Sequence, residues 1–457
     1  MANRFVKTGG SNLLDGTTTG NAWETAIYGF TNVGASNTLK FLTGTYDIAR
    51  SSVYTPIPNG SSGSPTIITD NGDGAVTFNH NGSDSFFGLL YFTGRSPTAQ
   101  YISFIGTAAK QLIFDLEDQA KGACIYVGNE PATDVSFVNC EVRNAQGAGI
   151  LGGSSTNLLV DNCDIHDNGQ VQTQDHGIYA SGTGLIIKNS RIYNNIAWGV
   201  HCYDENKVGR QIYNNRIWGN GGDGILMSRG SGTIYNNVIF DNAQHGVSLW
   251  RTVDATVYHN SIYSNTWWGI SDGTDGRIAT RSLIKNNISI GNTLGDCKTF
   301  STSANAVISW NIFGTASITS LSASDTVSDN AFSKTAANTW VDPTNATPSL
   351  KDFNLKALSP AIWDATTNNA ESVGVGTDIA GTSRVHPDQG AYAYGTPDPP
   401  DPPVIGHLTN YPVTVWTLEN IALTLFDNDG NTKDLTLDGS TDGVSIEFGD
   451  NTNCTVT

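Results

Sequence analysis

The sequence predicts an all-β protein, a right-handed single-stranded parallel β-helix followed by a small C-terminal β domain. Three observations support this fold class. A pattern of paired Asn, an apolar residue and a later Gly recurs along the chain, the strand-like runs are short, and Gly reaches 50 of 457 residues. Short strands separated by Asn and Gly turns are typical of stacked solenoid coils.

The repeat is clearest in the middle of the chain. The apolar residue after each Asn pair recurs at intervals of 23, 27, 25, 22 and 23 residues. Leucine-rich repeats have a similar period, but their leucine spacing and helical segment are absent. Because one coil cannot bury its inner face alone, coils stacked about 4.8 Å apart should form the core. We therefore expect these apolar residues on one interior ladder: Val142, Ile165, Ile192, Ile217, Ile239 and Ile262.

The turn residues of the repeat also have an expected structural role. Side-chain amides cap backbone groups at turns and can pair with the coils above and below, so we interpret Asn214, Asn215, Asn236 and Asn237 as structural. The six cysteines are too few and too scattered for a disulfide framework. Cys140 and Cys163 hold equivalent inward positions and should be buried thiols. No histidine shares their face, so no zinc site is predicted.

The chain divides into a long solenoid and a small C-terminal domain. We expect the β-helix over residues 1–395, with an N-terminal cap over about 1–100, regular coils over about 100–335 and a closing segment over about 336–395. A proline-rich linker, TPDPPDPP, occupies 396–403 and should separate two bodies. In the β domain, 404–457, two strand-like runs flank DNDGNT and predict a hairpin. Asp427, Asp429 and Asn431 of that loop could bind calcium, although the distal Glu of an EF-hand loop is absent.

Composition narrows the range of partners. The formal net charge of −18 repels nucleic acid and anionic membranes, and no apolar run approaches the roughly 18 to 20 residues of a membrane span. The start, MANRFVKTGG, lacks the apolar run of a secretory signal. Of a trimmed leader, a cytoplasmic protein and a virion protein released by lysis, we favour the last. We therefore expect an extracellular or virion-borne protein.

One face of the solenoid collects the candidate functional residues. The residue after Gly should point inward, so the second and fourth residues after Gly should point outward. This places Tyr179 and His201 at the same outward position of adjacent coils. Aromatic, histidine and charged residues gather around them, and a contiguous aromatic stripe is typical of a binding surface. The candidate substrate-binding residues are Trp198, Trp250, Trp267, Trp268, His245, Arg251 and Asp204.

Two chemistries are compatible with this face. Polysaccharide β-elimination needs a group that neutralises the uronate, a base and an acid, and Tyr and His can serve as the last two. A hydrolase needs two carboxylates instead, for which Asp204, Glu205, Asp223 and Asp175 are available. The alternatives are structural roles. Turn roles are the alternative for Asp223, His176 and His245, and the tryptophans would pack on a loop or on a partner. The candidate catalytic residues are His201, Tyr179, Tyr203, Arg229, Asp223, Glu205 and His176.

Segments on either side of the repeat resemble the pectate-lyase-like β-helix superfamily. GGSNLLDGTTTGNAWETAI with FLTGTYD, and DFNLKALSPAIWDA with DIAGTSRVHPDQGAYAYG, resemble its opening and closing segments. The resemblance spans about residues 5 to 395 and implies the fold. The superfamily includes lyases, hydrolases, epimerases and phage tailspikes. The strand DHGIYAS is also similar in position to the catalytic strand of mannuronan C5-epimerases, but their YGFDPHE signature is absent.

These observations favour a β-helix protein that binds and degrades a polysaccharide by lyase-type chemistry, in a setting like that of a phage tailspike. A phage receptor-binding or virion structural protein is the first alternative, and a secreted bacterial lyase, C5-epimerase or glycoside hydrolase is the second. The expected partner is a polysaccharide or cell-surface glycan, with a homotrimer or other virion proteins as the associations that the setting suggests. No cofactor is expected apart from the calcium candidate.

Overall fold

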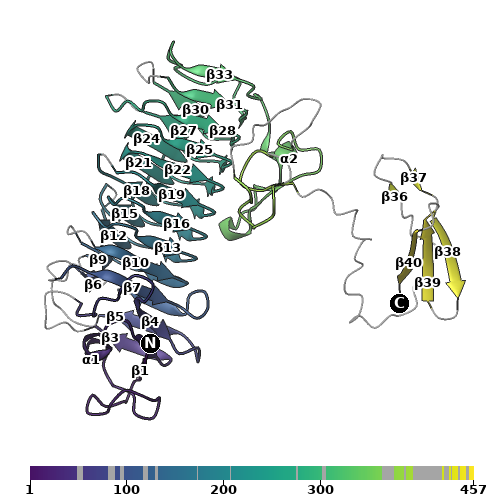
Figure 1. Ribbon diagram of the computed structural model, residues 1–457. Helices are drawn as coiled ribbons and strands as arrows, with labels where there is room; N and C mark the ends of the chain where they lie inside the picture. The colour runs from purple at the N-terminus through teal and green to yellow at the C-terminus, as the bar shows by residue number, and fades with distance from the viewer. Residues whose placement is uncertain are drawn as a thin grey trace. The chain divides into compact units, whose positions relative to one another are not determined.

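The computed structural model divides the chain into two compact units, Met1–Gly395 and Thr396–Thr457 (Figure 1). It describes residues 1–456 except 49–54, 81–87, 93–96, 117–121, 129–131, 172, 206, 274–275, 301–304, 363–374, 385–387, 395–424, 427–431, 434, 441–442 and 449–451. No helix in this described part is long and apolar enough to cross a membrane.

The first unit is a right-handed parallel β-helix, as predicted, and its coils build three parallel sheets within the described residues. Sheet 1 consists of β1 (Asn3–Val6), β2 (Thr38–Phe41), β4 (Thr66–Asp70), β7 (Gln100–Ile105), β10 (Thr133–Val138), β13 (Leu159–Asp161), β16 (Ile186–Lys188), β19 (Arg210–Tyr213), β22 (Gly232–Tyr235), β25 (Thr256–Tyr258), β28 (Leu283–Lys285), β31 (Val307–Ser309) and β33 (Thr326–Ser328). Sheet 2 consists of β3 (Gly44–Asp47), β5 (Val76–Asn79), β8 (Leu112–Asp115), β11 (Cys140–Arg143), β14 (Asp164–His166), β17 (Arg191–Tyr193), β20 (Arg216–Trp218), β23 (Val238–Phe240), β26 (Ser261–Tyr263), β29 (Ile288–Ile290) and β32 (Ile312–Phe313). Sheet 3 consists of β6 (Gly88–Tyr91), β9 (Ala123–Tyr126), β12 (Ile150–Gly153), β15 (Ile178–Ala180), β18 (Val200–Cys202), β21 (Ile225–Gly230), β24 (Val247–Thr252), β27 (Trp268–Asp272) and β30 (Gly295–Thr299).

The predicted interior ladder is confirmed in sheet 2. Neighbouring strands pair in the expected register, and every ladder member from β11 to β26 is fully buried. The paired residues are Val142, Ile165, Ile192, Ile217, Ile239 and Ile262. Cys140 and Cys163 are buried free thiols, as expected.

Asparagine ladders hold the turns. In the turn before sheet 2, the backbone N–H and the side-chain amide of Asn215 both donate to the Oδ1 of Asn237, and Asn237 repeats this pattern with Asn260. Asn214 and Asn236 adopt positive φ angles of 56° and 53°, a conformation that Asn tolerates well. The structural interpretation of these asparagines is confirmed.

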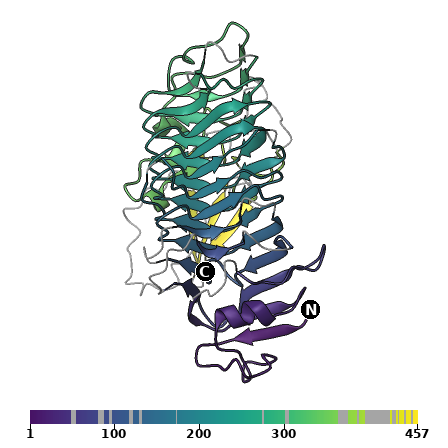
Figure 2. The ribbon, with the colours of Figure 1, turned by 90° about the vertical axis from the view of Figure 1, so that its left-hand side faces the viewer.

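The parallel sheets begin nearer the N-terminus than the coil repeat indicated. Strands β2 to β5 already belong to sheets 1 and 2, although the sequence there lacks the Asn pairs. The end of the solenoid is covered by α1 (Ala26–Asn32), which lies across the first coils in Figure 2. Phe30 of this helix packs on Phe41 and Phe78, with ring centroids 5.7 and 5.9 Å away.

The segment after the last coil folds back along the outside of sheet 2. It contains α2 (Ala336–Thr339), β34 (Trp340–Asp342), the 3-10 turn η1 (Pro348–Leu350) and β35 (Asp352–Leu355), which pairs antiparallel with β34. Phe353 packs on Phe240, and the backbone N–H of Ala391 donates to the hydroxyl of Ser261. We call the described residues from Ala336 to Tyr394 the fold-back segment; Figure 1 shows it beside the coils.

The second unit is an antiparallel β structure. β36 (Leu425–Phe426) pairs antiparallel with β37 (Thr432–Lys433), which confirms the predicted hairpin next to its turn. The rest of the second predicted run, from Leu435 onward, pairs instead with the strand that follows it in the chain. β38 (Leu435–Ser440), β39 (Gly443–Phe448) and β40 (Thr452–Val456) form a three-stranded sheet. The calcium candidates Asp427, Asp429 and Asn431, and the linker 396–403, lie outside the described residues.

Candidate functional site

The outward side of sheet 3 carries the candidate residues on consecutive coils. Tyr179 pairs in register with His201, and the ladder continues through Leu226 and Ser248 to Ser271. The register predicted for this ladder is therefore confirmed. We call this surface the aromatic–histidine face; it comprises His176, Tyr179, Trp198, His201, Tyr203, Asp223, Arg229, His245, Trp250, Trp267 and Trp268.

Glycines in front of the sheet 3 strands allow the coils to approach one another. A Cβ atom on Gly177 would lie 2.6 Å from the carbonyl oxygen of Gly199, and one on Gly199 would lie 2.7 Å from that of Gly224. A larger residue would therefore clash with the backbone of the next coil. The Gly of the sequence repeat marks this close approach, and it fixes which of the following residues face outward.

Part of this outward ladder is buried. Leu226 and Ser248 are fully buried, although they point away from the coil interior. Trp198, beside β18, contacts Trp250 of β24 with ring centroids 6.4 Å apart. Because these strands are two coils apart, the pair spans the intervening coil that holds Leu226. The face is thus a platform of side chains in two layers, where the sequence pattern alone indicated a single exposed ladder.

Two histidines form the centre of the face. Nδ1 of His201 lies 3.2 Å from Nε2 of His176, within hydrogen-bonding distance. The ring of Tyr179 lies 4.9 Å from that of His201, and the indole of Trp198 lies 4.8 Å from the ring of His176. The other ring nitrogens, Nδ1 of His176 and Nε2 of His201, are buried and have no hydrogen-bond partner within the described residues. The structure therefore brings together four of the candidate residues from two adjacent coils.

Burial keeps this histidine pair neutral. Desolvation lowers the pKa of His176 to about 3. Desolvation, His176 and the guanidinium of Arg210 lower the pKa of His201 well below its usual range. Burial raises the pKa of the Tyr179 phenol. At neutral pH one imidazole nitrogen of the pair donates to the other, and one further ring nitrogen of the pair carries no proton.

A charged group borders the histidines. The guanidinium of Arg229 lies over the ring of Tyr203, 5.1 Å from its centroid, and it forms a 2.6 Å salt bridge with Glu205. Tyr203 in turn lies 5.9 Å from the His201 ring and 6.3 Å from the Tyr179 ring. The Glu205 side chain is 61% exposed, so a carboxylate of a ligand can compete for the guanidinium.

Two further cations lie over aromatic rings on later coils. The guanidinium of Arg277 lies 4.0 Å from the Trp250 ring centroid, and the ammonium of Lys298 lies 5.3 Å from the Trp268 ring centroid. Sequence reasoning missed both. Lys298 pairs in register with Ser271 and so belongs to the outward ladder, which an alignment of the last coil would have shown. Arg277 follows a loop that departs from the repeat, and no sequence signal marks it.

Asp223 and His245 lie beneath the platform. Asp223 is fully buried and accepts a hydrogen bond from the backbone N–H of His245 at 2.9 Å. Burial raises the pKa of Asp223 to about 7, while His245 and the nearby Ser248 and Trp198 groups oppose the rise. Burial also lowers the pKa of His245 to about 4, and its Nδ1 accepts from the backbone N–H of Trp268. Both side chains therefore support the backbone and the indoles of the face.

The remaining candidates lie at its edges. Trp267 is 41% exposed and packs edge-on against His245. Arg251 is exposed, and its guanidinium donates to the carbonyl oxygen of Gly276 at 3.5 Å. Asp204 forms a 3.8 Å salt bridge with Lys207.

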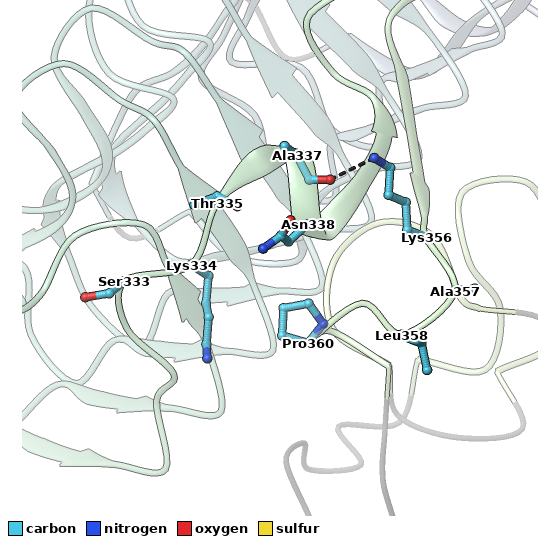
Figure 3. A pocket seen from close by; sticks show the side chains of 9 residues that line it. All are labelled: Ser333, Lys334, Thr335, Ala337, Asn338, Lys356, Ala357, Leu358 and Pro360. Carbon is cyan, nitrogen blue, oxygen red and sulfur yellow. Dashed lines mark hydrogen bonds between the residues drawn. The ribbon is translucent and has the colours of Figure 1, made fainter.

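A cavity of about 600 Å³ lies away from this face, between the residues that lead into the fold-back segment and the start of that segment. Figure 3 shows its lining, which comes from the chain around α2 and from the residues after β35. Lys356 turns toward the carbonyl oxygen of Ala337 and donates to it, whereas Lys334 points in another direction. The two ammonium groups do not converge, so this cavity offers no shared anion site.

The family comparison identifies the chain. A family model described as NosD, periplasmic copper-binding protein, matches residues 110–339, just over half of the chain. The chain belongs to the NosD family. The matched residues of this NosD-family protein include every coil that carries the aromatic–histidine face.

The donor set in the described residues does not fit a copper site. No group of three or more His, Cys, Asp or Glu side chains in this part of the chain could hold a metal ion. Cys202 and Met227, the soft donors nearest to His201 in sequence and register, are fully buried in the coil interior. Nδ1 of His201 and Nε2 of His176 lie within hydrogen-bonding distance of each other.

A curated relative comes from a phage. The NosD-family chain is 31% identical over 133 residues to the tail spike protein of Salmonella phage epsilon15, covering 27% of this chain and 10% of the relative. The chain thus spans about a tenth of the length of that tail spike.

Solved structures share the fold. The pectate lyase Pel9A matches with a TM-score of 0.54 and 16% identity, over 86% of this chain and 96% of that one. XylC in complex with xylose matches with a TM-score of 0.57 and 10% identity, over 86% and 98%. The A-module of the Azotobacter vinelandii mannuronan C-5 epimerase AlgE4 matches with a TM-score of 0.50 and 18% identity, over 65% and 86%. The resemblance to the pectate-lyase-like β-helix is thus confirmed for the fold.

Proposed function

We propose that this NosD-family protein binds an anionic polysaccharide on the aromatic–histidine face and cleaves it by β-elimination. The observation that carries the proposal is the contact cluster of Tyr179, His201, Tyr203 and Arg229, which come from three consecutive coils. It supplies an imidazole, two phenols and a guanidinium within ring-contact distance, which are the group types that this reaction needs.

The chemical roles follow from the groups present. Arg229 binds the uronate carboxylate in place of Glu205 and so stabilises the negative charge that develops when the proton at C5 leaves. His201, whose Nε2 is buried and has no hydrogen-bond partner among the described residues, takes that proton. The bond between C4 and the glycosidic oxygen then breaks, a double bond forms between C4 and C5, and Tyr179 donates a proton to the leaving oxygen.

Charge and aromatic surface favour an anionic glycan. The chain carries a formal charge of −18, yet Arg229 of this face lies over Tyr203, and Arg277 and Lys298 lie over its Trp250 and Trp268 rings. Such groups attract a polyanion locally against the net field. Trp250 and Trp268 offer indole surface for sugar rings beside these cations.

The relatives support the setting of the proposal. The epsilon15 protein is named a tail spike, and the structural neighbours are named a pectate lyase and a mannuronan epimerase. We infer a virion-borne or extracellular protein that meets a cell-surface glycan. Association as a homotrimer or with virion proteins is part of this proposal. A receptor-binding protein that holds the glycan without cleaving it is the second candidate, favoured by the burial of His176 and His201.

The test is a screen of acidic and neutral polysaccharides with the full chain. β-Elimination gives the ultraviolet absorbance of an unsaturated uronate, whereas hydrolysis gives reducing ends without it. His201→Ala should lower kcat by about 10² to 10⁴ while binding persists. His166→Ala, which removes a largely buried histidine from the outer face of sheet 2, is the matched control and should keep kcat.

The tryptophans test the binding half of the proposal. Trp250→Ala should raise KM more than it lowers kcat, because a stacking surface binds the ground state and the transition state alike. Reducing ends without absorbance would overturn the elimination chemistry. Glycan binding that depends on Trp250, with no cleavage of any substrate, would establish the receptor-binding alternative.

A further inference from the structure

Arg210, the first residue of β19, is a fully buried cation without an acidic partner. It is 0% exposed and forms no salt bridge in the part of the chain that the structure describes. Its guanidinium donates only to backbone carbonyl oxygens. These are the oxygens of Tyr203 at 2.7 Å, Gly182 at 3.1 Å, Arg229 at 3.2 Å, Asp204 at 3.4 Å and Ser181 at 3.5 Å.

These five carbonyls come from three consecutive coils. Ser181 and Gly182 follow β15, Tyr203 and Asp204 follow β18, and Arg229 lies in β21. A single planar guanidinium, with five N–H donors in fixed directions, therefore ties together the points where three neighbouring strands leave sheet 3. The same three strands carry the groups of the proposed site.

The backbone at these points is strained. Asp204 has a φ of 102° and Arg229 a φ of 68°, a region that residues with a side chain adopt rarely. Such conformations are unfavourable and persist only where surrounding contacts enforce them. Arg210 donates to the carbonyl oxygens of both residues, so it supplies such contacts.

Space around the guanidinium is equally constrained. A Cβ atom on Gly230 would lie 2.6 Å from the carbonyl oxygen of Lys207 and 3.3 Å from Nη1 of Arg210. Glycine at this position, with a φ of 67°, allows the loop after β18 to pack against β21. The loop and the strand thus meet around Arg210.

Stability alone is a weak explanation for such a residue. Removing a charge from water costs several kcal/mol, and apolar replacements of buried ionic groups are often neutral or stabilising. A buried charge is then better explained by the geometry that it specifies. Here that geometry places the phenol of Tyr203 under the guanidinium of Arg229, 5.1 Å away.

We propose that Arg210 is a positioning residue for the proposed polysaccharide site: it fixes the backbone of Tyr203 and Arg229, so that these side chains meet the anionic group of the sugar. The polysaccharide substrate in this inference rests on the proposed function. The positioning of Tyr203 and Arg229 rests on the hydrogen bonds of Arg210. Arg210 also acts on the site electrostatically, because its charge contributes to the low pKa of His201.

The test compares Arg210→Met with Arg384→Met in the full chain. Arg384 is the control, since it is a partly buried arginine in the fold-back segment that likewise donates to several backbone carbonyl oxygens, those of Asp388, Gly390 and Ala391, and also to Oδ1 of Asn236. Hydrogen–deuterium exchange should increase at the amides of residues 203–205 and 229–231 in Arg210→Met only. On a uronate polysaccharide that the wild type cleaves, KM should rise by about 10- to 100-fold in Arg210→Met, with a smaller change in kcat, since a small misplacement of binding groups has effects of this order.

Arg210→Lys keeps the charge and serves if the Met variant does not fold. An ammonium cannot reach three coils at once, so exchange at 229–231 should still increase while the fold persists. Unchanged exchange at both segments in the variant, or an equal rise in KM in Arg384→Met, would overturn the proposal. If no polysaccharide is bound or cleaved, the proposed function fails, whereas the exchange measurement still decides whether Arg210 positions these residues.

Discussion

Replacing Asp223 by asparagine should change how the stability of the solenoid depends on pH. The Asp223 carboxyl is fully buried, and the hydrogen bond that it accepts from the backbone N–H of His245 ends on Oδ1. Burial raises its pKa from 3.8 to about 7. This difference of about 3 units corresponds to about 4 kcal/mol of preference for the protonated form in the folded state.

The direction follows from proton linkage. Below pH 3.8 the carboxyl is protonated in both the folded and the unfolded state, so its ionisation does not lower the free energy of unfolding. As pH rises from 3.8 to about 7, the unfolded chain loses the proton and the folded chain keeps it, so stability falls and the loss is complete above about pH 7. Between about pH 5 and pH 8 the free energy of unfolding of the wild type should fall by roughly 2 to 3 kcal/mol because of this carboxyl.

The side-chain amide of the Asp223→Asn variant does not titrate, so this part of the pH dependence should vanish. The neighbouring His245, with a pKa of about 4, stays neutral in the folded state over the same range and contributes equally to both proteins. Urea unfolding of Asp223→Asn and wild type at the two pH values, followed by tryptophan fluorescence, measures the difference. Equal pH dependence in the two proteins would refute the buried, protonated carboxyl.

Two further predictions concern the fold. Asn215→Ala should destabilise the solenoid by about 2 to 4 kcal/mol in urea unfolding, because it leaves the buried backbone N–H of Ser190 and the carbonyl oxygen of Ile187 without their side-chain partner. Gln211→Ala, on the outer face of β19, is the control and should lower the free energy of unfolding by less than about 1 kcal/mol. Truncation after Gly395 should leave the thermal transition of the solenoid nearly unchanged in calorimetry, because the proline-rich linker indicates two independent bodies. A large fall in the transition temperature would show that the small unit stabilises the coils.

The coil architecture could be predicted because each coil repeats the same local constraints. The Asn pairs mark turns where amides bond along the stack, and the glycines mark places where a Cβ atom would strike the next coil. With turn and glycine positions known, alternation along the strand gives the inward and outward ladders, which is why Tyr179 and His201 could be paired from the sequence.

What lies over the ladders could not be predicted in the same way. Trp198 reaches across a whole coil to Trp250, and such a contact depends on side-chain direction, which the repeat does not encode. The fold-back segment covers the outside of sheet 2 through contacts between residues more than a hundred positions apart, such as Ala391 with Ser261. Arg210 lies two residues before the buried Ile212, so alternation along β19 places it inward. The carbonyl oxygens that its guanidinium meets on three coils depend on loop conformations that the repeat does not encode.

The most direct test of the account is a crystal structure of the His201→Ala variant with a bound oligouronate. The account predicts sugar on the aromatic–histidine face, with one carboxylate about 3 Å from the guanidinium of Arg229 and a sugar ring against Trp250. An oligosaccharide bound instead on the outside of sheet 1 or sheet 2, with Arg229 still paired to Glu205, would contradict it.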